Sequence, residues 1–241
     1  MISAVSSTQD LINFVYPQNV LNDSTACLKR AILCPTNAQV DNYNDMIIAY
    51  IEGAQRTYHA ADSLQEADDI GLIPPDSILD YFTTHTPAGL PRHALQIKVN
   101  AIYRLIRNLS LDLTLVKNSR IIIVDVGTRL VTVRILCGIA GGISVDSDDI
   151  LIPRISFTHQ LRSGYTLLRR QFPLAPAYAT TFNSCQGLTL DSVGVDLTVP
   201  VFSHGQLYTA MSRIRQRNHA RVRLPSGQTS TTNVTYPELL V

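Results

Sequence analysis

The order of α/β and β-rich stretches along the chain constrains the fold more than any other feature of this sequence. Residues 28–34 end in an apolar run that stops at Pro35, Thr36 and Asn37, which predicts a strand followed by a turn. From residue 39 to 51 apolar side chains recur at helical spacing, and Thr36 or Asn37 can cap the helix that this spacing predicts. Strand, turn and helix together form an α/β unit.

The middle of the chain has a different character. Residues 70–93 contain four prolines, enough to break a long element, and indicate a boundary or an exposed loop. Alternating or β-branched runs then predict four short strands, at 95–99, 121–126, 130–136 and 149–153. Short strands with glycines at the turns favour a small β barrel of roughly 70 to 80 residues.

The α/β character returns after the β-rich stretch. Residues 177–182 and 193–197 read as strands separated by a polar turn, and a helix is expected from Ser203 as its N-cap. We therefore predict an α/β domain into which a β module is inserted. Its expected parts are the discontinuous α/β domain at 1–50 and 171–224, the linker and barrel at 51–170, and a loose tail at 225–241.

Composition excludes several classes of protein. A chain of 241 residues with 45% hydrophobic residues can bury a core as one large or two small domains. We find no apolar stretch long enough for a membrane span and no secretion signal, so we expect no membrane partner. The four cysteines and six histidines show no ligand spacing, and no metal site is predicted.

The near-zero net charge hides a gradient along the chain. Residues 1–80 carry three Lys or Arg and eleven Asp or Glu, whereas residues 151–223 carry nine Arg and two Asp. Arginine binds phosphate in a bidentate fork, which suggests an anionic partner near the C-terminal third, although arginine bias can also reflect genome composition.

The turn at 183–190 is the first candidate site, because open α/β sheets bind ligands at the carboxyl ends of their strands. A turn that merely links two strands would have the same sequence pattern.

The helix expected from Ser203 carries the second candidate site. On this helix, Leu207, Met211 and Ile214 form the expected core stripe. The opposite polar face then carries Gln206, Thr209 and Arg213. Arg213 could act as an arginine finger, or be an ordinary solvated side chain.

A phosphate-binding loop is missing. None of the 12 glycines is followed by lysine, so the sequence contains no G-x-x-x-x-G-K-[ST] motif, and no acidic pair ends an apolar strand as a Mg²⁺ site would require. We expect that the chain does not bind ATP in the usual way by itself. A G-x-S-x-G motif and an obvious Cys/His pair are also absent.

Six collinear blocks carry a resemblance to a known family. They begin at Ala31, Leu90, Leu105, Arg169, Ala177 and Pro200, and include the runs Pro-Thr-Asn at 35–37, Asn-Ser-Cys-Gln-Gly at 183–187 and Ala-Met-Ser-Arg-Ile-Arg at 210–215. The chain resembles the C-terminal half of the petite-integration-frequency (Pif-type) DNA helicases, in the variant carried by Helitron transposons. These enzymes use ATP to move 5′ to 3′ on single-stranded DNA.

The resemblance implies a fold and a set of site residues. The fold is a second RecA-like lobe, interrupted by a small β barrel of Src-homology type. Arg213 would contact the γ-phosphate, Gln186 would be catalytic, and Gly187 and Gln206 would couple DNA to nucleotide. The implied DNA contacts are Pro35, Thr36, Asn37, Asn183, Ser184, Thr189 and His204.

The sequence departs from the family at two places. Ser184 and Cys185 stand where family members commonly have Lys-Ser, which removes a cationic phosphate contact, and residues 115–120 shorten a glycine-rich stretch. The first lobe, with the phosphate loop and Mg²⁺ carboxylates, is not found in the sequence. We therefore expect a helicase fragment without autonomous ATPase, which needs a first lobe in cis or in trans to use ATP and Mg²⁺.

Two alternatives remain open at this point, a non-catalytic single-stranded DNA-binding module and an inactive transposon remnant. Kinship with the family also suggests nuclear localisation and roles in telomere maintenance, DNA repair and recombination.

Overall fold

The structure of the chain is a computed structural model, and it divides into two compact units. It describes residues 2–65, 76–87, 89–139, 142–145, 148–161, 164–236 and 238. The first unit comprises residues 1–51 and 177–241, and the second comprises residues 52–176. The chain returns to the first unit at Ala177 and not at residue 171 as expected, because β12 and β13 pair with strands of the second unit.

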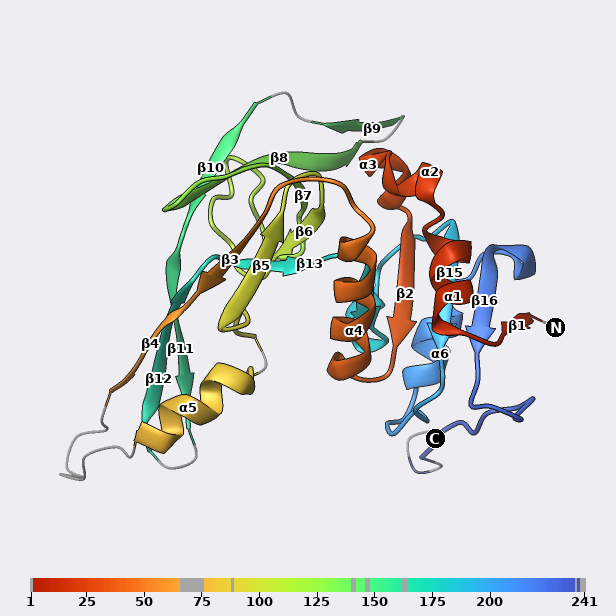
Figure 1. Ribbon diagram of the computed structural model, residues 1–241. Coiled ribbons are helices and arrows are strands. Elements are labelled where there is room, and N and C mark those ends of the chain that lie inside the picture. The colour runs from red at the N-terminus through yellow and green to blue at the C-terminus, as the bar shows by residue number, and fades with distance from the viewer. Residues whose placement is uncertain are drawn as a thin grey trace. The chain divides into compact units, whose positions relative to one another are not determined.

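The first unit is built on a parallel five-stranded sheet with the strand order β1-β16-β15-β2-β14 (Figure 1). Its strands are β1 (Ser3–Val5), β2 (Arg30–Cys34), β14 (Ala179–Thr181), β15 (Ser192–Asp196) and β16 (Ala220–Arg223). Its helices are α1 (Thr8–Val15), α2 (Gln18–Leu21), α3 (Ser24–Cys27), α4 (Asn37–Ala49) and α6 (Gln206–Met211), with short 3₁₀ turns at Asn183–Cys185 and Arg217–His219. This arrangement confirms the mixed α/β fold class.

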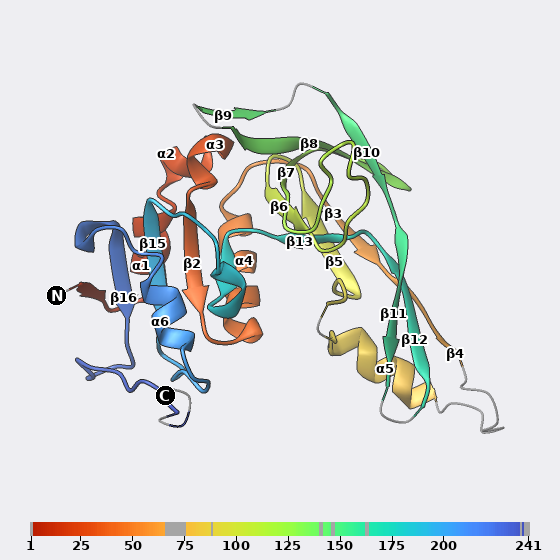
Figure 2. The same ribbon diagram turned by 180° about the vertical axis from the view of Figure 1, so that it is seen from behind.

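Helices cover both faces of this sheet. A Cβ atom added at Gly194 of β15 would lie 3.0 Å from side-chain atoms of Leu11 and Val15, so α1 packs closely on that face. The neighbouring Val193 and Val195 point to the opposite face, where they share a buried cluster with Ala210 of α6. Figures 1 and 2 show the two faces in turn.

The predicted strand, turn and helix at the start of the chain are confirmed. Strand β2 ends at Cys34, and Thr36 caps α4 by accepting a hydrogen bond from the Gln39 amide at 3.4 Å. The apolar residues expected on the inner face of this helix are buried. With 13 residues α4 is the longest described helix, and no described helix is both long and apolar enough to cross a membrane.

The helix expected from Ser203 begins later than predicted. Its N-cap is Gly205, whose φ of 71° is left-handed, and α6 spans six residues from Gln206. Gln206 and Ala210 are the buried residues of this helix, while Leu207 and Ile214 of the expected core stripe pack against the same cluster as partly buried side chains. The placement of Gln206 on an outward polar face was therefore wrong. Its side-chain oxygen instead accepts a hydrogen bond from the Phe202 amide at 3.1 Å.

The expected loose tail is partly fixed to the first unit. Residues 225–236 contain no helix or strand. However, Val234 packs against the buried cluster that contains Val193, Val195 and Ala210. The ring of Tyr236 stacks on His204 with 5.5 Å between ring centroids. These contacts correct the prediction for this part of the tail.

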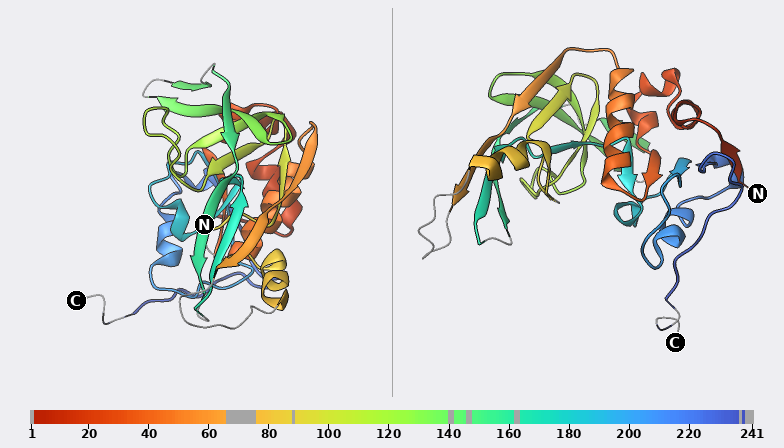
Figure 3. Two further views of the ribbon diagram at one scale, coloured as in Figure 1. Left: turned by 90° about the vertical axis from the view of Figure 1, so that its left-hand side faces the viewer. Right: turned by 60° about the horizontal axis from the view of Figure 1, so that its bottom comes forward.

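The second unit is rich in antiparallel strands (Figure 3). They are β3 (Gln55–His59), β4 (Ala61–Gln65), β5 (Ala94–Lys98), β6 (Ile102–Leu105), β7 (Arg120–Val126), β8 (Leu130–Ile139), β9 (Gly142–Val145), β10 (Ile150–Pro153), β11 (Ile155–Gln160), β12 (Thr166–Gln171) and β13 (Leu174–Pro176), with the helix α5 (Asp76–Thr84). The four predicted strands correspond to β5, β7, β8 and β10. The main sheet follows the order β10-β8-β7-β6-β13 with open ends, so the described strands form no closed barrel.

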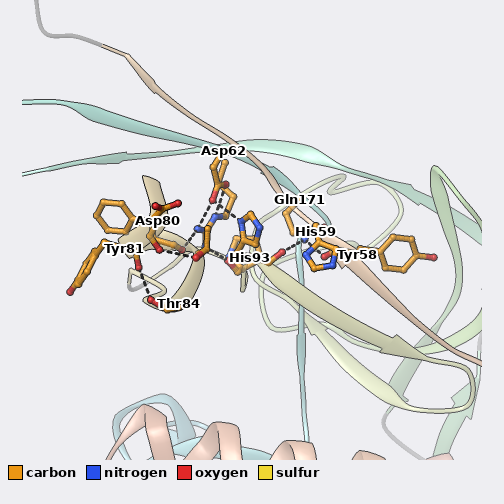
Figure 4. Close-up of polar contacts among 12 residues, drawn as sticks. Tyr58, His59, Asp62, Asp80, Tyr81, Thr84, His93 and Gln171 are labelled. Carbon is orange, nitrogen blue, oxygen red and sulfur yellow. Dashed lines mark hydrogen bonds and ion pairs between the residues drawn. The ribbon is translucent and has the colours of Figure 1, made fainter. Parts of the chain in front are cut away.

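A buried ion pair holds the smaller β11-β12-β4 sheet to its surroundings (Figure 4). Arg169 is fully buried and donates to both carboxylate oxygens of Asp62, at 2.9 and 2.7 Å. It also donates to the carbonyls of Phe82 and Pro91, while His93 approaches Asp62 at 2.9 Å. Arg169 therefore ties α5 and the segment before β5 to β4.

Replacing Asp62 by Asn should destabilise the second unit strongly at neutral pH. Burial raises the pKa of Asp62, but hydrogen bonds from Arg169 and His93 outweigh burial and hold the pKa below its ordinary value of 3.8. The carboxylate therefore contributes stability above pH 3.8 that is lost as pH falls through the lowered pKa. We expect Asp62→Asn to lower the free energy of unfolding by about 3 kcal/mol at pH 7 and to remove this acid dependence.

Urea unfolding at a series of pH values measures both effects. Asp149→Asn is the matched control, because Asp149 pairs with Arg134 at an exposed position and should cost less than about 1 kcal/mol. Equal losses in the two variants would contradict the assignment of Asp62 as a buried anchor.

Candidate functional site

The two segments predicted to follow a DNA strand leave the sheet from the same edge. Strands β2 and β14 are parallel neighbours, with Cys34 in register with Thr181. The Phe182 amide donates to the Cys34 carbonyl at 3.0 Å, just beyond the last paired residues. The turn at 35–37 and the turn at 183–189 therefore lie side by side at the carboxyl end of the sheet, where ligands bind in open α/β folds.

The second turn presents its polar groups to solvent. It opens with the 3₁₀ turn at Asn183–Cys185, where the Thr181 hydroxyl donates to the Ser184 hydroxyl at 2.9 Å. Gly187 has a φ of 83°, which is left-handed backbone that other residues adopt only with strain. The exposed predicted site residues here are Asn183, Ser184, Gln186, Gly187 and Thr189.

The first turn differs from the prediction in one residue. Asn37 is exposed and Thr36 is half-buried, but Pro35 is buried. Pro35 fixes the backbone where β2 ends, and its ring offers no surface to a ligand. The expected contact through Pro35 has no exposed side chain to support it and stays a prediction.

Arg213 lies directly after α6 and against the second turn. Its Nη1 donates to the Leu188 carbonyl at 3.4 Å and its Nη2 to the Ser212 hydroxyl at 2.9 Å, while Nε faces the Thr209 carbonyl at 3.3 Å. The side chain is half-buried. A guanidinium carries five N–H donors, so these contacts leave one N–H on each terminal nitrogen for an oxyanion.

His204 is engaged with the C-terminal segment. Its Nδ1 accepts a hydrogen bond from the Tyr236 amide at 2.9 Å, in addition to the ring stacking. His204 is thus held by Tyr236, and Gln206 is buried. Of the three site residues predicted at 204–213, Arg213 is the one whose side chain contacts the second turn.

A buried polar network at the end of β15 was missed by the sequence analysis. Asp196 is 1% exposed, and its Oδ2 accepts from the Tyr43 hydroxyl at 2.5 Å and from Arg223 at 3.0 Å. Its Oδ1 accepts from the Thr198 amide at 2.8 Å and the Thr198 hydroxyl at 2.6 Å. Gln39 then joins Thr198 to the cap of α4. Through Gln39, the buried network is therefore hydrogen-bonded to Thr36 of the first turn.

The charge of Asp196 shapes the chemistry of its neighbours. Burial, together with the hydrogen bond and the negative charge of Asp196, raises the pKa of the Tyr43 hydroxyl far above its usual range. Burial and the same carboxylate raise the pKa of the Cys34 thiol. Both groups therefore stay protonated at neutral pH. The available sequence signal was a single carboxylate at the end of an otherwise uncharged strand.

The described residues include no group of three His, Cys, Asp or Glu side chains that could hold a metal ion.

Comparisons with known proteins agree with this geometry. The human ATP-dependent DNA helicase PIF1 is 37% identical over 131 residues, which are 53% of this chain and 19% of that protein. The zebrafish (Danio rerio) ATP-dependent DNA helicase PIF1 is 29% identical over 211 residues, which are 84% of this chain and 29% of that protein. This chain is a homologue of the Pif1-type ATP-dependent DNA helicases. No family model matches it.

Solved Pif1 structures share the fold. The crystal structure of Pif1 helicase from Candida albicans covers 96% of this chain with a TM-score of 0.63 at 21% identity, and this chain covers 56% of it. The crystal structure of Bacteroides Pif1 bound to ssDNA covers 98% with a TM-score of 0.58 at 19% identity, and this chain covers 53% of it. The chain thus spans about half the length of these structures and less than a third of the curated relatives named above.

Cys185 offers a test of how tightly the second turn packs. Its thiol is fully buried, and burial raises its pKa to about 11 from an ordinary value of 9.0, despite the nearby positive charge of Arg213. The thiolate is the reactive form, so at pH 8 its population is roughly a hundredfold lower than in the unfolded chain. We expect Cys185 in the native protein to react with iodoacetamide at least that much more slowly than in urea.

Mass spectrometry of the peptide that contains Cys185 measures this rate for one residue. Alkylation at equal rates in native and unfolded protein would show that the turn does not bury the thiol.

Proposed function

We propose that this chain supplies the second RecA-like lobe and the inserted β module of an ATP-dependent DNA helicase that moves 5′ to 3′ on single-stranded DNA. The observation that carries this proposal is the meeting of three features at one sheet edge: the turn at 35–37, the turn at 183–189 and Arg213. One exposed surface would follow the strand, and Arg213 beside it would sense the nucleotide. A helicase needs such a connection between strand and nucleotide.

Arg213 is proposed to act as the arginine finger. The two N–H groups that remain free fit a γ-phosphate, and the half-buried position strengthens an electrostatic contact relative to water. Gln186 and Gly187 directly precede Leu188, whose carbonyl accepts a hydrogen bond from Arg213, and would transmit the state of the strand to this contact. Asn37, Asn183, Ser184 and Thr189 would lie along the strand.

ATP and Mg²⁺ enter this proposal through a first RecA-like lobe, in cis or in trans. Such a lobe carries the phosphate loop, whereas this sequence has no G-x-x-x-x-G-K-[ST] motif. The chain alone is therefore proposed to lack ATPase activity. The same observation supports the second candidate, a non-catalytic module that binds single-stranded DNA.

Kinship supports the finer parts of the proposal. We assign the β-rich second unit to the Src-homology-type insert of these helicases, in an open form. The Helitron-type sequence blocks, nuclear localisation and a role in telomere maintenance, DNA repair and recombination belong to the same proposal.

Adding a first lobe from a related helicase should restore DNA-stimulated ATPase that neither part shows alone. In the reconstituted system we expect Arg213→Ala to reduce turnover by on the order of 10³-fold with little change in DNA affinity, as for arginine fingers. A coupled assay of phosphate release, with and without oligothymidine, measures both quantities.

Arg215→Ala is the matched control. Arg215 is exposed and pairs with Asp191 at 3.2 Å, so its replacement removes the same charge two residues away and should leave turnover nearly unchanged. Equal effects of the two substitutions would refute the role of Arg213. ATPase by the purified chain alone would refute the dependence on a first lobe.

A further inference from the structure

A one-directional chain of hydrogen bonds runs from the first turn to the buried carboxylate of Asp196. The Thr36 hydroxyl donates to Gln39 Oε1 at 2.9 Å, and Gln39 Nε2 donates to the Thr198 hydroxyl oxygen at 3.1 Å. The Thr198 hydroxyl donates to Asp196 Oδ1 at 2.6 Å. These residues come from the cap and first turn of α4, the loop after β15 and the end of β15 itself.

Asp196 fixes the direction of this chain. An ionised carboxylate can only accept, so Thr198 must donate its proton to Asp196 and accept from Gln39. Gln39 consequently turns its amide nitrogen to Thr198 and its oxygen to Thr36. Arg223, Tyr43 and the Thr198 amide donate to the remaining acceptor positions of the carboxylate.

The direction has a consequence for Thr36. Its single hydroxyl proton points inward to Gln39, and its oxygen accepts from the Gln39 amide as the helix cap. The Thr36 hydroxyl therefore has no proton to donate to a phosphate at the surface. Its neighbour Asn37 is exposed and starts the helix.

We propose that Gln39 and Thr198 are positioning residues that hold the turn at 35–37 in its strand-binding conformation, and that Thr36 acts as part of this relay rather than as a direct donor to DNA. The inference rests on the proposed function. Removing one link leaves the Gln39 side chain without its partner at Thr198, so the group that accepts the Thr36 hydroxyl proton is no longer held in place. The turn then loses the orientation that presents Asn37 to a phosphate.

The test is a fluorescence anisotropy titration of the full chain with labelled oligothymidine of about 16 nucleotides, at several salt concentrations. Gln39→Glu preserves the size of the side chain but replaces the Nε2 donor by a carboxylate oxygen. That oxygen would face the Thr198 hydroxyl oxygen, whose proton is already donated to Asp196. Thr198→Val removes the hydroxyl. Each should weaken binding about three- to tenfold, the scale of one hydrogen bond, and reduce the salt slope by about 0.7, the value of one phosphate contact.

Three further variants make the relay distinguishable from a general loss of structure. The double variant should bind no more weakly than the weaker single variant, because both break one chain of bonds. Thr198→Ser keeps the hydroxyl and should restore binding to within about twofold of the unchanged chain. Gln18→Glu adds the same charge on α2, at an exposed position before β2, and should leave the salt slope unchanged.

The outcomes separate this inference from the function on which it rests. Normal affinity and slope in Gln39→Glu and Thr198→Val, or losses that multiply in the double variant, would overturn the relay while the proposed function stands. A fall in affinity with an unchanged salt slope would also overturn it, since unfolding alone would produce that result. If the unchanged chain does not bind the oligonucleotide, the proposed function fails and the inference fails with it.

Discussion

The parallel pairing of β2 with β14 is the interaction on which the candidate site depends. These strands are separated by the whole second unit in sequence, yet their last paired residues, Cys34 and Thr181, lie opposite each other. Because parallel strands end at the same edge, the pairing brings the two polar turns together. Asn44 secures it, since its side-chain oxygen accepts from the amides of Tyr178 and Ala179 at 3.0 and 2.9 Å, where the chain re-enters the first unit.

Local patterns predicted much of the first unit and four strands of the second, β5, β7, β8 and β10. The helical spacing from residue 39 identified α4, and Thr36 fulfils its expected capping role because capping depends on a few adjacent residues. The helix α1 was not predicted, although Ser7 and Asp10 form a capping box at its start. Whether the strands of the second unit close into a barrel was not predictable from strand patterns. Alternation of apolar and polar residues indicates which face of a strand is buried, but it does not indicate which strand pairs with it.

The parts of the site that the sequence analysis missed depend on contacts between distant segments. The helical pattern predicted Gln206 on an outward polar face, but its side chain is buried and its oxygen accepts a hydrogen bond from the Phe202 amide. Asp196 receives its partners from α4, β16 and the following loop, which no single window of sequence contains. Arg213 was a candidate from its place on the expected helix, and the family resemblance implied its contact with the γ-phosphate. Its hydrogen bond to the Leu188 carbonyl depends on the fold.

Hydrogen exchange of the chain with and without oligothymidine, read by mass spectrometry, tests most directly whether the two turns form one strand-binding surface. The account predicts that the strand slows exchange in residues 35–39 and 183–190 together, over the same concentration range. Residues 217–223, at the other side of the sheet, should be unchanged. Protection of one turn without the other, or protection confined to the second unit, would contradict the account.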